Sequence, residues 1–465
     1  PSLRRMRLYS TLSRASEEVA PGGGPVRMYS CGPTVYRSVH IGNLRSFLLS
    51  DLIRRGLEFE GREVTQVMNI TDVGHMTDEA SDSGRDRMEL ATADEGLAPL
   101  EIAEKYTRSF LEDAEALGLL RAHVYPRATE HIEEMLELTE RLIAAGHAYE
   151  VGGSVYFDVA SFPGYGMLSG NTLENLRAGH RQELEVDPNK RNPADFALWK
   201  RAGANRLMRW PSPWGEGFPG WHIECSAMAL KHLGESIDVH TGGVDLIFPH
   251  HEDEIAQSEG AVGHRVVAIW AHGGHLRLSA QKMAKSSGNV ITIADLVAQG
   301  YDPLAYRFLT FRARYRSEMD FSPDAMDDAD GQVRRLRRRM AEWGGPATLG
   351  GTALEFDRRF RDAVADDLDL PRALVIVNEA VAAGIPDGER FALLSSWDRV
   401  LGLDLTREVG RTFEPDATVR ALLAERDAAR ASRDYATSDR IRVTLEEMGL
   451  EVTDTPAGTS VRPRP

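Results

Sequence analysis

The sequence has 465 residues, of which 42% are hydrophobic and 27% are charged, and its formal net charge is −16. This composition is that of a folded globular protein and excludes a disordered or fibrous chain. The length predicts three or more domains, because single hydrophobic cores rarely grow beyond about 250–300 residues. No apolar run reaches the roughly 18–20 residues of a membrane helix, so we expect a cytoplasmic protein with no membrane partner.

The chain has only two cysteines, Cys31 and Cys225. A disulfide framework normally shows several cysteines at closer spacing, so free thiols or metal ligands are expected instead. The acidic net charge argues against a surface coated with nucleic acid, although a local basic strip such as residues 334–339 is compatible with it.

The first elements along the chain predict a strand, a helix and a second strand. Residues 26–29 form a short apolar stretch, a helical pattern runs from about residue 41 to residue 59, and a second apolar stretch covers residues 64–70. This order is typical of a parallel sheet with a crossover helix, in which ligands bind at the carboxyl ends of the strands. We therefore expect a site near residues 31–43. Residues 78–96 are rich in Asp, Glu, Ser and Gly, which predicts a mobile excursion from the sheet.

The later segments predict further units. Residues 99–117 and 129–145 have long helical patterns, and residues 150–204 alternate with turn signals that indicate a small inserted subdomain. The sheet resumes at residues 236–239, and residues 326–403 are almost wholly helical. A linker at 410–415 precedes two helices, at 419–430 and 435–448, and a short strand at 450–452.

The segment Val39-His40-Ile41-Gly42-Asn43 lies where a strand leads into a helix. A helix N-terminus offers unpaired N–H groups and a positive dipole, which suit a phosphate, and glycine lets the backbone approach closely. Residues 282–289 add Lys282 and Lys285 in a loop of small residues. Two such ammonium groups suit the charge that develops on a leaving pyrophosphate. Taken alone, His40 could be an ordinary packing residue, and residues 282–289 could be an exposed basic turn.

Together these segments resemble the HIGH and KMSKS signatures of class I aminoacyl-tRNA synthetases. Four further segments, 31–36, 190–200, 221–228 and 248–254, resemble the cysteinyl branch of that class, and the resemblance covers nearly the whole chain. It implies a Rossmann-type α/β catalytic domain that activates cysteine with ATP and loads it onto tRNA(Cys). It also implies catalytic roles for His40, Asn43, Lys282 and Lys285. Ala284 and Ser287 depart from the family's usual lysine loop.

A metal site is the second expectation. On a helix, His250 and Glu254 share a face and suit one zinc ion, although the same spacing also suits a solvated helix turn. The resemblance implies that Cys31, Cys225, His250 and Glu254 hold one Zn²⁺ per chain, with His251 as a neighbour. Because zinc binds a thiolate far better than a serine hydroxyl, the metal would select cysteine by roughly 10⁴–10⁵ without a separate editing site.

The resemblance also assigns the rest of the pocket. It implies a cysteine pocket formed by Gly32, Thr34, Thr71 and Trp221. It implies that ATP, accompanied by Mg²⁺, contacts His40, Gly42, Gly242, Gly243, Asp245 and Lys285. Trp221 could instead be an ordinary core residue, and Asp245 could simply belong to a turn.

The arginines of residues 421–442, together with residues 454–459, resemble the family's anticodon-reading domain, in which basic and planar side chains meet unstacked bases. We expect a monomer divided into a first catalytic half (1–135), an inserted subdomain (136–205), a second catalytic half with the zinc site (206–265), a stem-contact region with the lysine loop (266–322), a helical bundle (323–410) and an anticodon-binding domain (411–465).

Two rival functions share many of these residues. An amino-sugar cysteine ligase of mycothiol synthesis has the same core and zinc site, but such ligases lack the anticodon domain that residues 419–459 resemble. A non-catalytic or pathway-specific RNA-binding paralogue is the second rival. Retention of His40, Lys282, Lys285 and the four zinc ligands argues against it.

Overall fold

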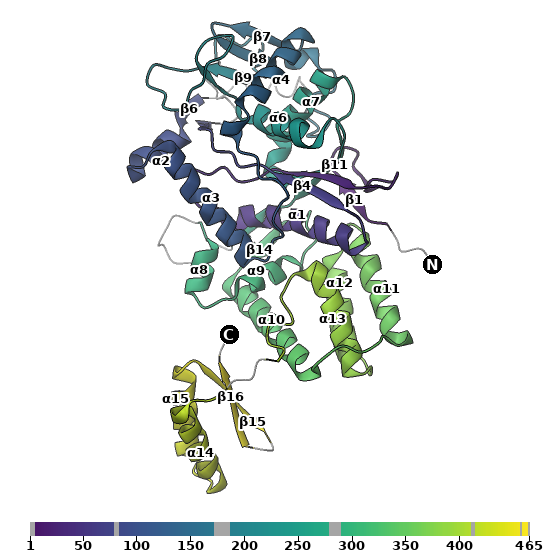
Figure 1. Ribbon diagram of the computed structural model, residues 1–465, viewed down its shortest axis with the longest axis vertical. Coiled ribbons are helices and arrows are strands. Elements are labelled where there is room, and N and C mark those ends of the chain that lie inside the picture. Colours follow the sequence, from purple (N-terminus) through teal and green to yellow (C-terminus); the bar gives the residue numbers. More distant parts are fainter. Residues whose placement is uncertain are drawn as a thin grey trace.

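The computed structural model describes residues 5–78, 83–171, 187–278, 290–410, 414–455 and 458–463. The elements are arranged along the long axis of the molecule, with an antiparallel sheet at one end, a parallel sheet in the middle, a helical bundle next, and a small C-terminal unit at the far end (Figure 1). None of the helices in the described part of the chain combines the length and apolar character that a bilayer span needs.

The central sheet has four parallel strands in the order β12-β11-β3-β4. They are β3 (Val26–Ser30), β4 (Val64–Met68), β11 (Ile237–Gly243) and β12 (Val267–Gly273). The sheet is mostly buried on both faces, as is usual for parallel strands. The predicted strand–helix–strand order and the parallel sheet are confirmed.

Helices cover both faces of this sheet and divide the core into two parts. Helix α1 (Ile41–Phe59) packs on one face, where its apolar side chains join the core of the helical bundle. Helices α6 (Trp221–Leu233) and α7 (Glu252–Val262) belong to the second core, on the other face, which continues into the antiparallel sheet. Short turns η3 (Val244–Leu246) and η4 (Ile247–His251) lead from β11 to α7.

The antiparallel sheet has the order β10-β9-β8-β7. Its strands are β7 (Ala148–Val151), β8 (Ser154–Phe157), β9 (Phe196–Arg201) and β10 (Gly217–Pro219). Helix α4 (Ile132–Ala144) precedes this sheet, and the turns η1 (Ala128–Glu130) and η2 (Val159–Ser161) flank α4 and β8. The structure thus has a separate sheet where the sequence predicted an inserted subdomain.

Within residues 78–96, where the sequence predicted a mobile excursion, residues 83–95 form a regular strand and helix, whereas residues 79–82 lie outside the described residues. Strands β5 (Met76–Asp78) and β6 (Ser83–Asp86) form a hairpin that leads directly into helix α2 (Arg87–Glu95), which is followed by α3 (Pro99–Ala116). Asp86 caps α2 by accepting the N–H groups of Met88 and Glu89, and it also forms a buried ion pair with Arg206 at 2.6 Å. The composition of this segment led to the wrong prediction. A single well-placed aspartate can cap the start of a helix, and such a cap leaves no apolar run in the sequence.

The remaining elements complete the body. A short hairpin, β1 (Arg7–Ser10) with β2 (Ala15–Glu18), lies at the N-terminal end, and β13 (Leu276–Leu278) pairs in parallel with β14 (Met319–Phe321). The helices that follow the lysine segment are α8 (Ile293–Ala298), α9 (Pro303–Thr310), α10 (Pro323–Trp343), α11 (Gly351–Ala365), α12 (Leu370–Ala382) and α13 (Asp387–Leu401).

The C-terminal unit has its own small core. Helices α14 (Ala417–Ala431) and α15 (Tyr435–Glu447) pack on the antiparallel pair β15 (Leu450–Thr455) and β16 (Gly458–Pro463). An ion pair between Arg338 of α10 and Glu451 of β15, at 2.7 Å, connects this unit to the bundle. Both partners are about one-third exposed, so the link adds little stability.

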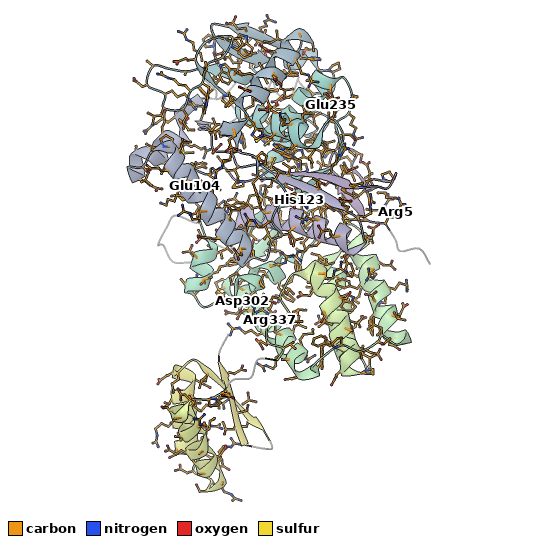
Figure 2. All side chains as sticks on the ribbon, viewed as in Figure 1. Arg5, Glu104, His123, Glu235, Asp302 and Arg337 are labelled. Carbon is orange, nitrogen blue, oxygen red and sulfur yellow. The ribbon has the colours of Figure 1, made fainter. Side chains whose placement is uncertain are left out.

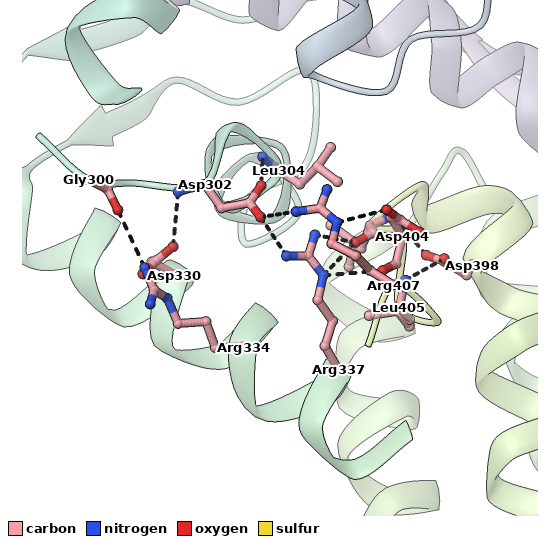
Figure 3. A network of polar contacts seen from close by, with 11 residues as sticks. Gly300, Asp302, Leu304, Asp330, Arg334, Arg337, Asp398, Asp404, Leu405 and Arg407 are labelled. Atoms are coloured by element: carbon pink, nitrogen blue, oxygen red, sulfur yellow. Dashed lines mark hydrogen bonds and ion pairs between the residues drawn. The ribbon is translucent and has the colours of Figure 1, made fainter. Parts of the chain in front are cut away.

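An ion-pair network ties the end of the bundle to α9 and α10 (Figure 3). One carboxylate oxygen of Asp302 contacts Arg337 at 2.5 Å and Arg407 at 2.6 Å, and the other accepts the N–H of Leu304 and so caps α9. Arg337 also donates to the carbonyl oxygens of Leu403 and Asp404. Asp302 and Arg337 lie side by side below the sheet (Figure 2). Asp302 therefore joins three segments that are far apart in the sequence.

We predict that Asp302→Asn lowers the free energy of unfolding by about 3 kcal/mol at pH 7, because Arg337 is left buried without its counter-charge while the amide still caps α9. Burial alone would raise the pKa of Asp302, but Arg337, the N–H of Leu304 and Arg407 together outweigh burial, and the pKa is lowered. The stabilisation by the carboxylate is thus present above its unfolded pKa of about 3.9 and is lost as pH falls through the lower folded value.

Urea denaturation of both proteins between pH 7 and pH 3 measures this effect, and the difference between them should shrink at the acidic end. Arg407→Ala is the control, since this side chain is one-third exposed and its loss should cost only about 0.5–1 kcal/mol. Equal losses in the two variants, or a difference that does not change with pH, would contradict a central role for the Asp302 carboxylate.

Candidate active site

A single cavity of about 450 Å³ lies at the carboxyl ends of β3, β4, β11 and β12. This is where a parallel sheet is expected to bind its ligands. Most of the site residues predicted from the sequence line it, namely Cys31, Gly32, Thr34, His40, Gly42, Asn43, Thr71, Trp221, Cys225, Gly243, Asp245 and His250. Segments from both halves of the chain therefore meet in one pocket.

His40 caps the N-terminus of α1 at one end of the cavity. Its Nδ1 accepts the N–H of Asn43 at 3.3 Å, and the Asn43 side chain in return accepts the N–H of His40 at 3.3 Å. Because Nδ1 is an acceptor, the neutral ring carries its hydrogen on Nε2. Burial, followed by the nearby charge of Arg37, lowers the pKa of His40. The ring is thus a neutral N–H donor beside the positive end of a helix dipole, which suits a phosphate.

The glycines near this end leave no room for side chains. A Cβ on Gly42 would lie 2.9 Å from the His40 ring, and a Cβ on Gly243 would lie 2.3 Å from the carboxylate of Asp245. On Gly242 a Cβ would lie 2.5 Å from His251, away from the cavity lining. Gly243 and Asp245 therefore line the cavity, while Gly242 lets β11 pass close to His251.

Lys282 and Lys285, with Ala284 and Ser287, lie outside the described residues, so their catalytic role stays a prediction.

Asn69 organises the other end of the cavity. Its side-chain oxygen accepts the N–H of Gly32 at 2.9 Å, and its amide nitrogen donates to the Thr71 hydroxyl at 2.9 Å. A Cβ on Gly32 would lie only 1.8 Å from the carbonyl oxygen of Asn69, so glycine is required there. Thr34 forms a β-bridge with Thr71. The ring centroids of Trp221 and His250 are 4.4 Å apart, so the indole forms an aromatic wall beside this end of the cavity.

Four potential metal ligands converge beside this wall. The ligand atoms of Cys31, Cys225, His250 and Glu254 all lie within 4.8 Å of one another, and all four residues are buried. The two sulfur atoms are 4.0 Å apart, and His250 Nε2 is 3.1 Å from the Glu254 carboxylate. Two thiolates bound at about 2.3 Å to one tetrahedral zinc ion would be about 3.8 Å apart. The donor set and its spacing therefore fit Zn²⁺.

A second set shares two of these residues. Cys31, His240, His251 and Glu254 also lie within 4.8 Å of one another. However, His251 Nδ1 is 2.7 Å from His272, and His240 packs against Trp270 with ring centroids 4.3 Å apart. Cys31, Cys225 and His250 line the cavity, whereas His240 and His251 do not. The cavity therefore reaches three members of the first set and, of the second set, only the shared Cys31.

The histidines around the first set have shifted pKa values. Burial lowers the pKa of His240 to about 4 and that of His272 to about 3, and it also lowers the pKa of His222 and His251. These rings are therefore neutral at physiological pH, as a hydrogen-bonded shell around a cation requires. His222 connects Asp253, at 3.3 Å, to His250 Nδ1, at 2.9 Å, and so orients the His250 ring.

Sequence reasoning missed several residues of the cavity. Asn69, Tyr36 and Arg87 line it, as does the segment 273–276. The signal available for that segment was the glycine pair after the apolar strand 266–271, the same pattern that marked residues 242–243. Asn69 gave no local signal, because its role is to hydrogen-bond two residues on different segments.

The comparisons with known proteins agree with this geometry. The family model for the catalytic domain of class I (C) tRNA synthetases matches residues 18–331. A cysteine–tRNA ligase of Thermus thermophilus is 44% identical over 97% of this chain and 98% of its own length. The cysteine–tRNA ligases of Treponema denticola, at 41%, and Chlorobaculum tepidum, at 42%, match over 97–98% of this chain and 98% of their own lengths.

Solved structures support the fold. The Mycobacterium tuberculosis methionyl-tRNA synthetase in complex with methionyl-adenylate superposes with a TM-score of 0.56 at 15% identity, and covers 89% of this chain and 96% of its own. At this identity the likeness shows the fold alone. The full-length sequence matches carry the assignment further, and the chain belongs to the cysteine–tRNA ligase family of class I tRNA synthetases.

Proposed function

We propose that the chain activates L-cysteine with ATP and transfers it to the 3′-terminal adenosine of tRNA(Cys). One observation carries this proposal: a single cavity joins the His40-capped helix N-terminus to the buried Cys31, Cys225, His250 and Glu254 set. The first feature suits a phosphate and the second suits a thiol. Family membership supports the same reaction.

At the nucleotide end, the first turn of α1 and the Nε2–H of His40 bind phosphate oxygens of ATP, and Mg²⁺ accompanies these phosphates. Gly42 allows close approach of the backbone, and Asp245 accepts a hydrogen bond from the ribose hydroxyls. Lys282 and Lys285 stabilise the charge that develops on the leaving pyrophosphate.

At the thiol end, Cys31, Cys225, His250 and Glu254 would hold one Zn²⁺. When bound, this ion supplies affinity for the thiolate of cysteine over the hydroxyl of serine. Trp221 forms the wall beside it, and Asn69 holds Gly32 and Thr71 in place at this end of the cavity.

The chemical step is an in-line attack of the cysteine carboxylate on the α-phosphorus of ATP. A carboxylate oxygen–phosphorus bond forms as the bond to the pyrophosphate oxygen breaks, which gives cysteinyl-adenylate. Positioning and charge stabilisation supply the rate, so no side-chain nucleophile is required. The tRNA hydroxyl then attacks the activated carbonyl and releases AMP.

The C-terminal unit is proposed to bind the anticodon region of tRNA as part of a monomer. Of its arginines, Arg426 is buried and pairs with Asp454 at 2.5 Å, so it holds the unit together and is not available to RNA. Arg433, Tyr435 and Arg440 are all exposed, and they lie on or next to α15. This combination of basic and planar side chains suits unstacked bases.

The first prediction from this proposal concerns the metal. Purified protein should carry one zinc per chain, and Cys225→Ser should lose it, because a hydroxyl replaces a thiolate poorly. His240→Asn, which changes only the second candidate set, should keep its zinc. Metal analysis by mass spectrometry measures both. If His240→Asn loses zinc while Cys225→Ser keeps it, the second set holds the ion.

The second prediction concerns the lysine loop. Lys285→Ala should lower the kcat of cysteine-dependent ATP–pyrophosphate exchange about 100-fold, because the lost charge acts mainly in the transition state. The matched control is Lys105→Ala, an exposed lysine of α3 that pairs with Glu95 far from the cavity lining. Equal exchange rates in Lys285→Ala and wild type would remove this loop from the mechanism.

The third prediction concerns the C-terminal unit. Ending the chain at Gly410 should leave pyrophosphate exchange intact but weaken tRNA charging, because the unit has a core of its own, separate from the two cores of the body. Exchange and charging assays on both proteins measure the two half-reactions. Undiminished charging by the shortened chain would refute the anticodon role, and charging of an amino sugar in place of tRNA by the full chain would favour the mycothiol ligase.

A further inference from the structure

Arg45 lies in the second turn of α1, and its buried side chain does not line the cavity, although the neighbouring Ser46 and Phe47 do. Its Nη1 donates to the carbonyl oxygens of Gly274 and His275, each at 2.7 Å. Its Nη2 donates to the carbonyl oxygen of Ser317 at 2.6 Å and lies 3.5 Å from that of Arg314. All four acceptors are main-chain oxygens from two other segments, so one guanidinium joins three parts of the chain.

These two segments are hydrogen-bonded to each other and pack closely. Gly274 donates its N–H to Tyr315 at 2.7 Å, and Met319 donates its N–H to His275 at 3.0 Å. A Cβ on Gly274 would lie 2.4 Å from the carbonyl oxygen of Ser317. The carbonyl groups that face α1 are thus matched by the fixed fork of an arginine, whose donors diverge in one plane. A lysine ammonium is a single point and cannot reach both segments in the same way.

The clamped segment forms a wall of the cavity. Gly273, Gly274, His275 and Leu276 line it together with His40 and Asn43, which belong to the N-terminus of α1. Arg45 is on that same helix, so it sets the separation between the phosphate end and the 273–276 wall. We propose that Arg45 is a positioning residue for the nucleotide. It does not touch ATP, and it fixes the width of the slot in which ATP lies. This inference rests on the proposed function for the identity of the nucleotide.

Arg55 provides a matched comparison on the same helix. It also donates to main-chain oxygens, those of Gly118 at 2.7 Å and Arg399 at 2.9 Å, and it pairs with Asp51 at 2.7 Å. None of these residues lines the cavity. Replacement of Arg55 therefore disturbs packing around α1 without moving the nucleotide wall.

The test uses the full chain with Arg45→Met, Arg45→Lys, Gly274→Ala and Arg55→Met. Direct ATP binding by titration calorimetry is measured without cysteine, and pyrophosphate exchange gives the KM for ATP and for cysteine. Melting temperatures report stability. In Arg45→Met we expect the Kd and KM for ATP to rise about tenfold or more, with the KM for cysteine within about twofold of wild type, because a displaced wall misplaces the nucleotide alone.

Two further variants keep the test decisive if Arg45→Met does not fold. Gly274→Ala moves the same wall while Arg45 is retained, and should raise the Kd for ATP in the same way. Arg45→Lys keeps the positive charge but should not restore ATP affinity.

The inference is overturned if folded Arg45 variants bind ATP as wild type does, or if Arg45→Met and Arg55→Met change stability and both KM values alike. Wild-type protein that binds ATP but shows no cysteine-dependent exchange would overturn the proposed function alone, since the calorimetric comparison of Arg45 and Arg55 still decides the role of Arg45. Wild-type protein that does not bind ATP would overturn both.

Discussion

The parallel pairing of β3 with β11 is the constraint on which the site depends. It joins Tyr29 to His240 and lets Cys31 donate its N–H to Thr241, although about 210 residues separate the partners. Because the two strands are parallel, the segments that follow them leave the sheet at the same edge. The first then supplies the thiol of Cys31 and the capped start of α1, and the second supplies Asp245 and the helix that carries Glu254. A shift of this register by one residue would turn these side chains to the opposite face.

Buried charge is the cost of this arrangement. Glu254 lies among thiols, with the Cys31 sulfur 3.6 Å from its carboxylate, in a region with almost no access to water. Burial raises the pKa of the Cys31 thiol, while the hydrogen bond from Cys31 lowers the pKa of the Cys225 thiol. Burial lowers the pKa of His250, but Cys225 and Glu254 outweigh burial and raise it, so a protonated His250 or a shared metal cation would compensate these acidic side chains. The neutral histidines around them supply hydrogen bonds without adding charge that would compete with the cation.

The sequence predicted the main elements and much of the cavity lining because these depend on local patterns. Apolar runs gave β3, β4 and β11, and the helical pattern that begins near residue 41 gave α1. Residues 87–95 were misjudged, because the Asp86 cap and its ion pair with Arg206 involve a segment about 120 residues away. Arg426 was read as a possible contact to RNA, yet it is buried against Asp454. The second candidate ligand set and the role of Asn69 depend on tertiary packing, and no spacing in the sequence reports them.

Helix α1 shows how the two cores serve one site. Its N-terminus meets the cavity, and its later turns are held by charged groups that face the helical bundle. Asp51 accepts from the fully buried Arg307 at 2.6 Å, and Arg307 in turn donates to the carbonyl oxygen of Leu401 at the end of α13. Tyr306, next in sequence to Arg307 on α9, donates its hydroxyl to the carbonyl of Ile41 at 2.6 Å. A helix held at both ends by buried polar contacts has little freedom to tilt, so the orientation of its N–H groups toward a phosphate is set before the ligand arrives. Such preorganisation is what electrostatic stabilisation of a phosphoryl centre requires, because dipoles that must reorient during the reaction lose most of their effect.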